Sequence, residues 1–234
     1  AQRELYRGQC NCAYWHGAFG GVYLPHLRNA VYNHLIAADN LLDQVVDKDA
    51  SWIEAESQDY NLDGQPEVSL ANRKLIGLIA PQGGGHLYEL DVRSICHNLL
   101  ATLMRREEAY HEKVRGGARD GGGDVANIHD DRVVFKQEGL QDRLAFDRTA
   151  RKSLVDHFYT NDVSIDQVSR NTFEERGDFA TGNFDAKIRR AEDRVQVQLS
   201  RLGRVGQHEI KLTKGVTLHA DSSTLEIAYV LDNL

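Results

Sequence analysis

The chain has 234 residues, of which 41% are hydrophobic and 27% charged, and its formal net charge is -7. A chain of this length can bury a sizeable core without disulfides or metals. Its acidic balance argues against non-specific binding to nucleic acid or to anionic membranes, and no apolar run reaches the length of a transmembrane helix.

The cysteines and the first residue bear on where the protein works. Three cysteines are an odd number, which argues against a disulfide framework and favours a reducing compartment. We therefore expect a cytoplasmic protein. The sequence starts at Ala1 with no initiator Met and no signal-peptide pattern, and the simplest expectation is a piece of a longer protein.

Residues 1–56 are expected to form a helical segment. Pro25 occupies a position suited to a first helical turn, and the apolar residues after it follow approximate helical spacing to about residue 46. The stretch before Pro25 is expected to be a loop or a short helical turn, and a second short helix is predicted over residues 49–55.

The hydrophobic period changes near residue 57, where we place a domain boundary. Asp63-Gly64 is a hairpin signal, apolar strands lie on either side of Asn72-Arg73, and the glycine-rich turn at 81–85 precedes another strand. These features predict an antiparallel sheet.

A helical and then a flexible stretch are expected to interrupt the strands. Residues 99–114 have helical composition, whereas residues 115–131 contain five glycines and four aspartates and predict a long flexible loop. No Lys-Ser/Thr pair follows these glycines, so a phosphate-binding loop is not expected.

Strands are predicted to dominate from Val133 onward. Apolar and polar residues alternate in three segments, at 194–199, 209–213 and 225–231, as in a sheet with one buried face. The predicted fold class is therefore α+β, with a helical segment at 1–56 and an antiparallel β-sandwich at 57–234.

The stretch at 8–27 combines glycine, aromatic and neutral polar residues with almost no charge. Tyr14 and Trp15 supply flat apolar faces, and Gln9, Asn11 and His16 supply neutral donors and acceptors. This combination suits an uncharged, hydroxyl-rich ligand such as a sugar. Composition alone leaves open the alternative that the aromatic rings pack the start of the helix against another domain.

The spacing Cys10-x-Cys12-x3-His16 raises the possibility of a zinc site. Structural zinc takes four ligands, usually from paired knuckles, and the remaining cysteine, Cys96, lies in a different region. We therefore expect small buried cysteines in the wall of a cleft, with no metal and no cofactor.

The runs 9–17 and 20–28 resemble glycoside hydrolase family 57, in the branch of α-amylases and 4-α-glucanotransferases. The resemblance continues at 87–91, 105–111, 146–148 and 153–158. It implies that the opening segment follows a catalytic barrel and closes one side of its cleft. It also implies a C-terminal sandwich of the galactose-mutarotase type, which we expect to be incomplete at Leu234.

A retaining glycosidase needs two carboxyl groups about 5 Å apart. Glu89 and Asp91 alternate on a predicted strand and should share one face, but they lie outside the opening stretch. Asp147-Arg148 and Asp156-His157 are interpreted as buried pairs that fix the β-domain. The resemblance places the nucleophile and the acid/base in the upstream barrel, so no catalytic residue is expected in this chain.

The resemblance therefore implies part of an enzyme that cleaves and transfers α-1,4-glucosidic bonds with retention. Its partners would be an α-glucan or maltooligosaccharide and the upstream barrel. The substrate contacts would come from Trp15, Tyr14, His16, Asn11 and Gln9. Aromatic platforms favour a sugar acceptor over water, which favours the transferase, while the amylase stays open.

The alternative function is a non-catalytic carbohydrate-binding or structural sandwich. The chain also departs from the family pattern in two places. Cys12 stands where an acidic residue is expected, and the glycine-rich loop at 115–131 is long.

Overall fold

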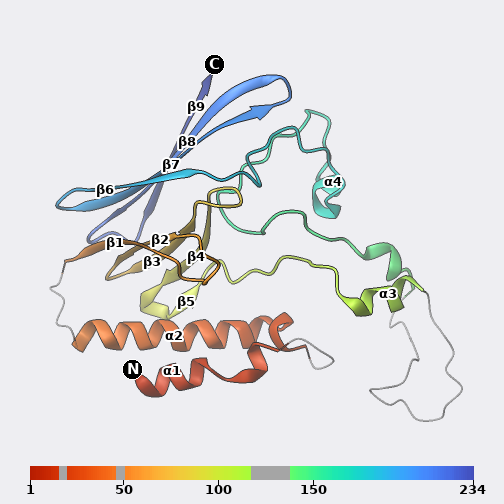
Figure 1. Cartoon of the computed structure of the whole chain (residues 1–234). Helices are drawn as coiled ribbons and strands as arrows, with labels where there is room; N and C mark the ends of the chain where they lie inside the picture. Colours follow the sequence, from red (N-terminus) through yellow and green to blue (C-terminus); the bar gives the residue numbers. More distant parts are fainter. Residues whose placement is uncertain (16–19, 46–50, 117–137) are drawn as a thin grey trace, which may run out of the picture.

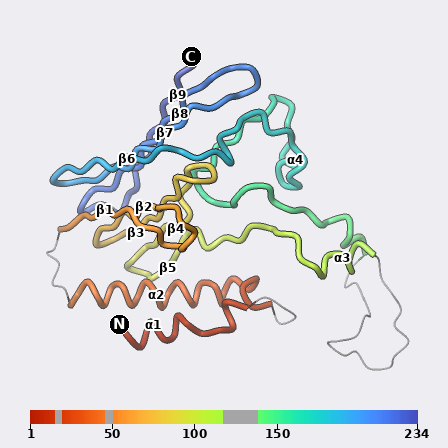
Figure 2. The backbone as a smooth tube through the Cα atoms, viewed as in Figure 1, coloured from red at the N-terminus to blue at the C-terminus, as the bar shows by residue number. Residues whose placement is uncertain are grey.

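The computed structural model describes residues 1–15, 20–45, 51–116 and 138–234. These residues form one helical layer and two antiparallel sheets. In Figure 1 the helices lie below the first sheet and the second sheet lies above it, and the backbone tube follows the same arrangement (Figure 2). The expected class, α+β with a helical start and an antiparallel sandwich, is confirmed.

The helical layer consists of α1 (Gln2–Gly8), the short 3-10 turns η1 (Asn11–Ala13) and η2 (Gly21–Tyr23), and α2 (Pro25–Val45). The expected helix after Pro25 is thus confirmed, whereas α1 was not anticipated. The two helices approach closely at Gly8, where a Cβ atom would lie 2.8 Å from the Leu35 side chain. An ion pair of 2.7 Å between Glu4 and His34 also joins them.

The first sheet has the strand order β1-β2-β3-β4-β5. Its strands are β1 (Ile53–Gln58), β2 (Glu67–Asn72), β3 (Leu75–Ala80), β4 (His86–Val92) and β5 (His97–Asn98), with the turn η3 (Arg93–Ile95) before β5. The predicted hairpin at 63–64, the strands on either side of Asn72-Arg73 and the turn at 81–85 are confirmed by the pairing of the strands around them. The predicted helix over 49–55 is wrong for residues 53–55, which pair with β2, and its first two residues lie outside the described part.

The second sheet has the order β6-β7-β8-β9. Its strands are β6 (Asp185–Arg190), β7 (Arg194–Val205), β8 (His208–His219) and β9 (Leu225–Asn233). The three segments with alternating residues all lie in these strands. The division into domains at residue 57 stays a prediction, although β1 begins four residues before it.

The core lies between the two sheets. It takes apolar side chains from both, including Leu70 and Ile79 of the first sheet and Val197 and Val216 of the second. Lys214 of β8 is fully buried among them. Its Nζ donates hydrogen bonds to the carbonyl oxygens of Gly84 (2.9 Å), Gly85 (2.6 Å) and Leu154 (2.7 Å).

The connection between the sheets is more irregular than the sequence suggests. The helix expected over 99–114 is present only as α3 (Ala109–Arg115). The described residues 138–184 contain the turn η4 (Gln141–Arg143) and helix α4 (Ile165–Arg170) but no long strand, so the predicted strands after Val133 begin only at Asp185. The glycine-rich loop at 115–131 lies almost wholly outside the described residues.

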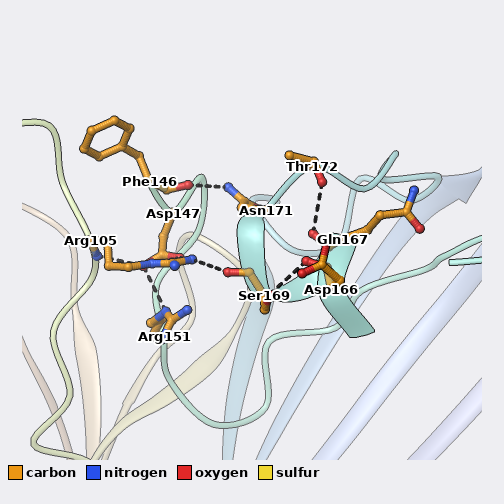
Figure 3. Close-up of polar contacts among 9 residues, drawn as sticks. All are labelled: Arg105, Phe146, Asp147, Arg151, Asp166, Gln167, Ser169, Asn171 and Thr172. Carbon is orange, nitrogen blue, oxygen red and sulfur yellow. Dashed lines mark hydrogen bonds and ion pairs between the residues drawn. The ribbon is translucent and has the colours of Figure 1, made fainter. Parts of the chain in front are cut away.

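Side-chain hydrogen bonds hold this connection in place of regular structure (Figure 3). Asp147 accepts hydrogen bonds from the backbone N–H and guanidinium of Arg105 and pairs with Arg151 at 2.9 Å. Burial raises the pKa of Asp147, but the hydrogen bonds from Arg105 and Arg151 outweigh it, so the pKa lies below its ordinary value. Asn171 donates to the carbonyl of Phe146 at 2.8 Å.

Two predicted ion pairs are wrong in their partners. Asp147 pairs with Arg105 and Arg151 rather than with its neighbour Arg148. Asp156 lies 2.6 Å from Lys214, and His157 pairs instead with Glu175 at 2.5 Å. Arg105 and Lys214 lie 42 and 58 residues from their acids along the chain, so the sequence around each acid does not indicate these partners.

Candidate functional site

The candidate site is the segment of residues 9–15, here called the aromatic loop. It follows α1 directly and contains η1. It leaves the side chains of Tyr14 (60%) and Trp15 (55%) exposed. Gln9 and Asn11 are exposed as well, so the structure gathers four of the five predicted contact residues on one short segment. The fifth, His16, lies outside the described residues.

The backbone of the aromatic loop is fixed although its side chains are exposed. Ala13 is buried beneath the loop. The Tyr14 hydroxyl donates a 2.7 Å hydrogen bond to the Gly8 carbonyl, which ties the side chain to the end of α1 while the ring stays exposed to solvent. The N–H of Val22 donates to the Trp15 carbonyl, also at 2.7 Å. Two exposed rings are therefore held on an anchored backbone.

Gly21, at the start of η2, lets the backbone pass close to the Trp15 carbonyl at the end of the aromatic loop. Its φ is +44°, in the left-handed region, and a Cβ at this position would lie 1.7 Å from the Trp15 carbonyl oxygen. Any larger residue at this position would displace the backbone of Trp15.

A second anchor connects the site to the loop that follows the first sheet. Arg28 of α2 donates to the Val22 carbonyl at 2.7 Å and to the Ala101 carbonyl at 3.3 Å. The Tyr23 hydroxyl donates to the Glu108 carboxylate, and this hydrogen bond, with some burial, raises the pKa of Tyr23. The N-terminal end of α2 is thus tied to segment 101–108.

The cysteines of the loop differ from the expectation. Cys10 and Cys12 are exposed rather than buried in a cleft wall, and all three cysteines are free. A 3-10 turn has too few residues to cover its own side chains, which explains their exposure. Among the described residues, no group of three or more His, Cys, Asp or Glu side chains could hold a metal ion.

The carboxyl pair on β4 lies at the seam between α2 and the first sheet. Glu89 and Asp91 share a hydrogen bond, which confirms that they face the same side of the strand. Burial and the adjacent Glu89 raise the pKa of Asp91 to about 8. Burial and then these two acids raise the pKa of Tyr32 in α2 to about 12.

Asp91 is only 3% exposed, and such a pair shares one proton because two adjacent buried charges repel each other. Next to it, Arg93 is buried and pairs with Asp43, while its Nε donates to Asn40 at 2.9 Å. The seam therefore fixes the position of α2.

The sequence reasoning missed the anchors of the aromatic loop. The Gly20-Gly21 pair was a usable signal, because adjacent glycines mark a close approach of backbones. No local pattern indicates that Arg28 reaches Ala101 or that Tyr23 reaches Glu108, since these partners are separated by 73 and 85 residues.

Comparison with known protein families shows which family the chain belongs to. A model of the C-terminal domain of alpha-amylase/4-alpha-glucanotransferase matches residues 59–234, and a model of the middle domain of the same proteins matches residues 1–42. The chain is thus the type of helical and β-sandwich region found in these carbohydrate-active proteins. It belongs to the alpha-amylase/4-alpha-glucanotransferase family, as the residues of the opening stretch imply.

Individual relatives agree with this assignment. The chain is 32% identical to "Alpha-amylase 1" of Dictyoglomus thermophilum, over 100% of this chain and 32% of that protein. It is 34% identical to the 4-alpha-glucanotransferase of Thermococcus kodakarensis, over 94% of this chain and 32% of that protein. The chain therefore spans about a third of the length of these relatives, which carry both activity names.

A solved structure has the same fold. The crystal structure of the 4-alpha-glucanotransferase from Thermococcus litoralis aligns with a TM-score of 0.79 and 28% identity, over 99% of this chain and 31% of that chain. Within the part of the chain that the structure describes, no helix is long and apolar enough to cross a membrane.

Proposed function

We propose that this chain supplies one wall of the substrate cleft in an enzyme that acts on α-1,4-glucans. The enzyme cleaves the glucosidic bond with retention and passes the glucan to an acceptor sugar. The two carboxyl groups that perform this reaction lie in a barrel upstream of Ala1. The wall is the aromatic loop, and the sandwich supports it through α2. The free cysteines suit a cytoplasmic enzyme.

The observation that carries the proposal is the exposure of Tyr14 and Trp15 on a fixed backbone. Contiguous exposed apolar surface marks interaction sites, Tyr14 and Trp15 are adjacent exposed rings, and a flat ring with polar edges matches the face of a glucose unit. Trp15 serves as the platform, and the Tyr14 ring extends it.

The polar members of the site orient the sugar. Gln9 and Asn11 are exposed on the same segment as the rings and offer amide donors and acceptors to sugar hydroxyls, and His16, next in the sequence after Trp15, adds an imidazole. None of these groups is a carboxylate, so the loop binds the glucan and leaves proton transfer to the barrel. A platform of this type holds an acceptor sugar better than water, which favours transfer over hydrolysis.

The first test replaces Trp15 by Ala in the full-length enzyme. We expect kcat/KM for maltooligosaccharides to fall about tenfold, equivalent to about 1.4 kcal/mol of lost transition-state binding, while the thermal transition is unchanged. Tyr6→Ala is the matched control, because Tyr6 is an equally exposed ring (62%) on α1; its contact with the aromatic loop is made by its backbone carbonyl, which accepts from the Gln9 N–H at 3.3 Å and is kept in the variant. Unchanged kinetics of the Trp15 variant on both long and short glucans would contradict the stacking role.

The second test asks where the carboxyl groups lie. The 234-residue chain is incubated with maltoheptaose, and the released sugars are measured. We expect no turnover, because the acid pair of β4 is buried. Release of sugar by the pure chain would overturn the assignment of the catalytic groups to the barrel.

A further inference from the structure

A groove in the sandwich domain has the chemistry of a second binding site. It has a volume of about 510 Å³, within the range of small-molecule sites. One wall is formed by residues 159–161 and the other by the turn between β7 and β8, with Arg176 between them. Figure 1 shows this turn at the top of the view, whereas α1 and α2 lie at the bottom with the first sheet between.

Backbone hydrogen bonds connect both walls to one central segment. The N–H of Arg176 donates to the Phe158 carbonyl at 2.9 Å, and the N–H of Gly206 donates to the Arg176 carbonyl at 2.8 Å. Gly177 pairs with Val205 in an isolated β-bridge. The two walls are thereby held at a fixed separation, so the groove needs no rearrangement before it binds a ligand.

Tyr159 is the aromatic platform of the groove. Its ring stacks on His157, with centroids 5.6 Å apart and planes inclined by 8°, and it meets Phe173 edge-on at 4.7 Å. Glu175 holds His157 at 2.5 Å and also accepts from the Phe158 N–H at 2.8 Å. The ring is fixed from behind, yet 38% of Tyr159 remains exposed.

The rim of the groove favours an uncharged ligand rich in hydroxyl groups. Asn161 and Gln207 present amides, Thr160 a hydroxyl and His208 an imidazole. Arg176, the charged residue of the lining, is paired with Glu174 at 2.8 Å, and the neighbouring Asp162 carboxylate accepts from the Thr160 hydroxyl. An anionic ligand would therefore find little net attraction, whereas a sugar would find a flat ring flanked by neutral donors and acceptors.

We propose that this groove binds a segment of an α-glucan chain as a second, non-catalytic site. The identity of the sugar rests on the function proposed above, whereas the preference for a neutral polyhydroxyl ligand rests on the groove itself. A glucan bound at this site and at the aromatic loop together gains from the effective concentration that the first contact creates. The groove therefore affects long, branched glucans more than short ones.

The test measures retardation of the full-length protein in native gels that contain glycogen. We expect Tyr159→Ala to raise the apparent dissociation constant about fivefold to tenfold, as the loss of one aromatic contact predicts. The double variant Asn161→Ala/Gln207→Ala leaves Tyr159 and its packing in place and should raise it about twofold to fivefold. Tyr6→Ala, an exposed tyrosine elsewhere, should migrate like the wild type, and kcat/KM for maltotriose should stay unchanged in all of them.

The outcomes separate the two proposals. If the double variant folds normally and both variants keep wild-type retardation, the groove does not bind glucan, whatever Trp15→Ala does to turnover. If retardation falls in the groove variants while Trp15→Ala leaves turnover unchanged, the groove stands and the role of the aromatic loop fails. Weakened retardation by Tyr159→Ala together with wild-type retardation of the double variant would reduce the claim to ring stacking and overturn the role of the rim.

Discussion

The sandwich and the helical layer differ in which side chains they bury and which they expose. The sandwich buries apolar side chains from both sheets around a lysine whose hydrogen bonds are satisfied. The helical layer buries only Ile36 and Ala38 of its long helix and exposes the aromatic rings of its loop. The difference teaches that the sandwich holds most of the buried core, while the helical layer presents exposed rings on a backbone that the sandwich holds in place.

Lys214 tests the sandwich side of this comparison and should give the largest effect. Lys214→Met removes the ammonium group that three carbonyl groups and Asp156 contact. The Asp156 carboxylate, whose side chain is 14% exposed, then loses the cation beside it. We expect the free energy of unfolding to fall by about 3–5 kcal/mol, the range for breaking a buried ion pair from one side. Denaturant titration of the 234-residue chain measures it.

Lys211→Met on the same strand is the matched control, because Lys211 is exposed. Its free energy of unfolding should change by less than about 0.5 kcal/mol. Similar losses for the two variants would mean that the buried contacts of Lys214 add nothing to the stability of the sandwich.

Asp91 tests the seam between the two regions. Its pKa is raised to about 8 in the folded chain, so the folded state keeps a proton that the unfolded state loses near pH 4. The unfolded state binds fewer protons in this window, and the free energy of unfolding therefore decreases as the pH rises from about 4 to about 8. Asp91→Asn, whose amide can donate to Glu89 at every pH, should be about 1–3 kcal/mol more stable than the wild type at pH 8.

Denaturant titrations at pH 5, 7 and 9 give the comparison. Asp91→Asn and the wild type should differ least at pH 5 and most at pH 9. Glu56→Gln, at an exposed position of β1, should follow the wild type throughout. A wild-type profile that rises between pH 5 and pH 9, or an Asp91 variant parallel to it, would refute the shared proton at this seam.

The same comparison explains how much of the molecule the sequence predicts. Helix α2 and the long strands follow from hydrophobic periodicity, because each element covers a whole face of a layer. The hairpin turns at Asp63-Gly64 and Asn72-Arg73 follow from local turn residues. The exposure of the aromatic loop also follows from its residues, because glycine and neutral polar side chains are typical of a binding surface.

The region between residues 99 and 184 could not be predicted in this way. The conformation of its described residues, 99–116 and 138–184, depends on hydrogen bonds between distant residues, such as Arg105 with Asp147, and a composition that suits a helix carries no information about them. Lys214 is a second example, because alternation places it on the core face and its charge argues against burial. The carbonyl groups at Gly84, Gly85 and Leu154, together with the Asp156 carboxylate, explain its position.

Gly21 sharpens the comparison on the side of the aromatic loop, where the expected effect on stability is smallest. Gly21→Ala places a methyl group where the Trp15 carbonyl lies, so the loop must shift while the sandwich is untouched. We expect a loss of about 1–2 kcal/mol in unfolding free energy and a fall of about tenfold in kcat/KM for maltooligosaccharides, because Trp15 is displaced from the position in which we propose that it stacks on the sugar.

Gly64→Ala separates the two causes of this effect. Gly64 also has a positive φ, +84°, but a Cβ there meets nothing within 4 Å, so this variant carries the conformational cost without the clash. It should lose about 1 kcal/mol of stability and keep its kinetic constants. If Gly21→Ala behaves like Gly64→Ala in both assays, the backbone of Trp15 can shift without consequence, and the fixed geometry of the aromatic loop is not what the glucan recognises.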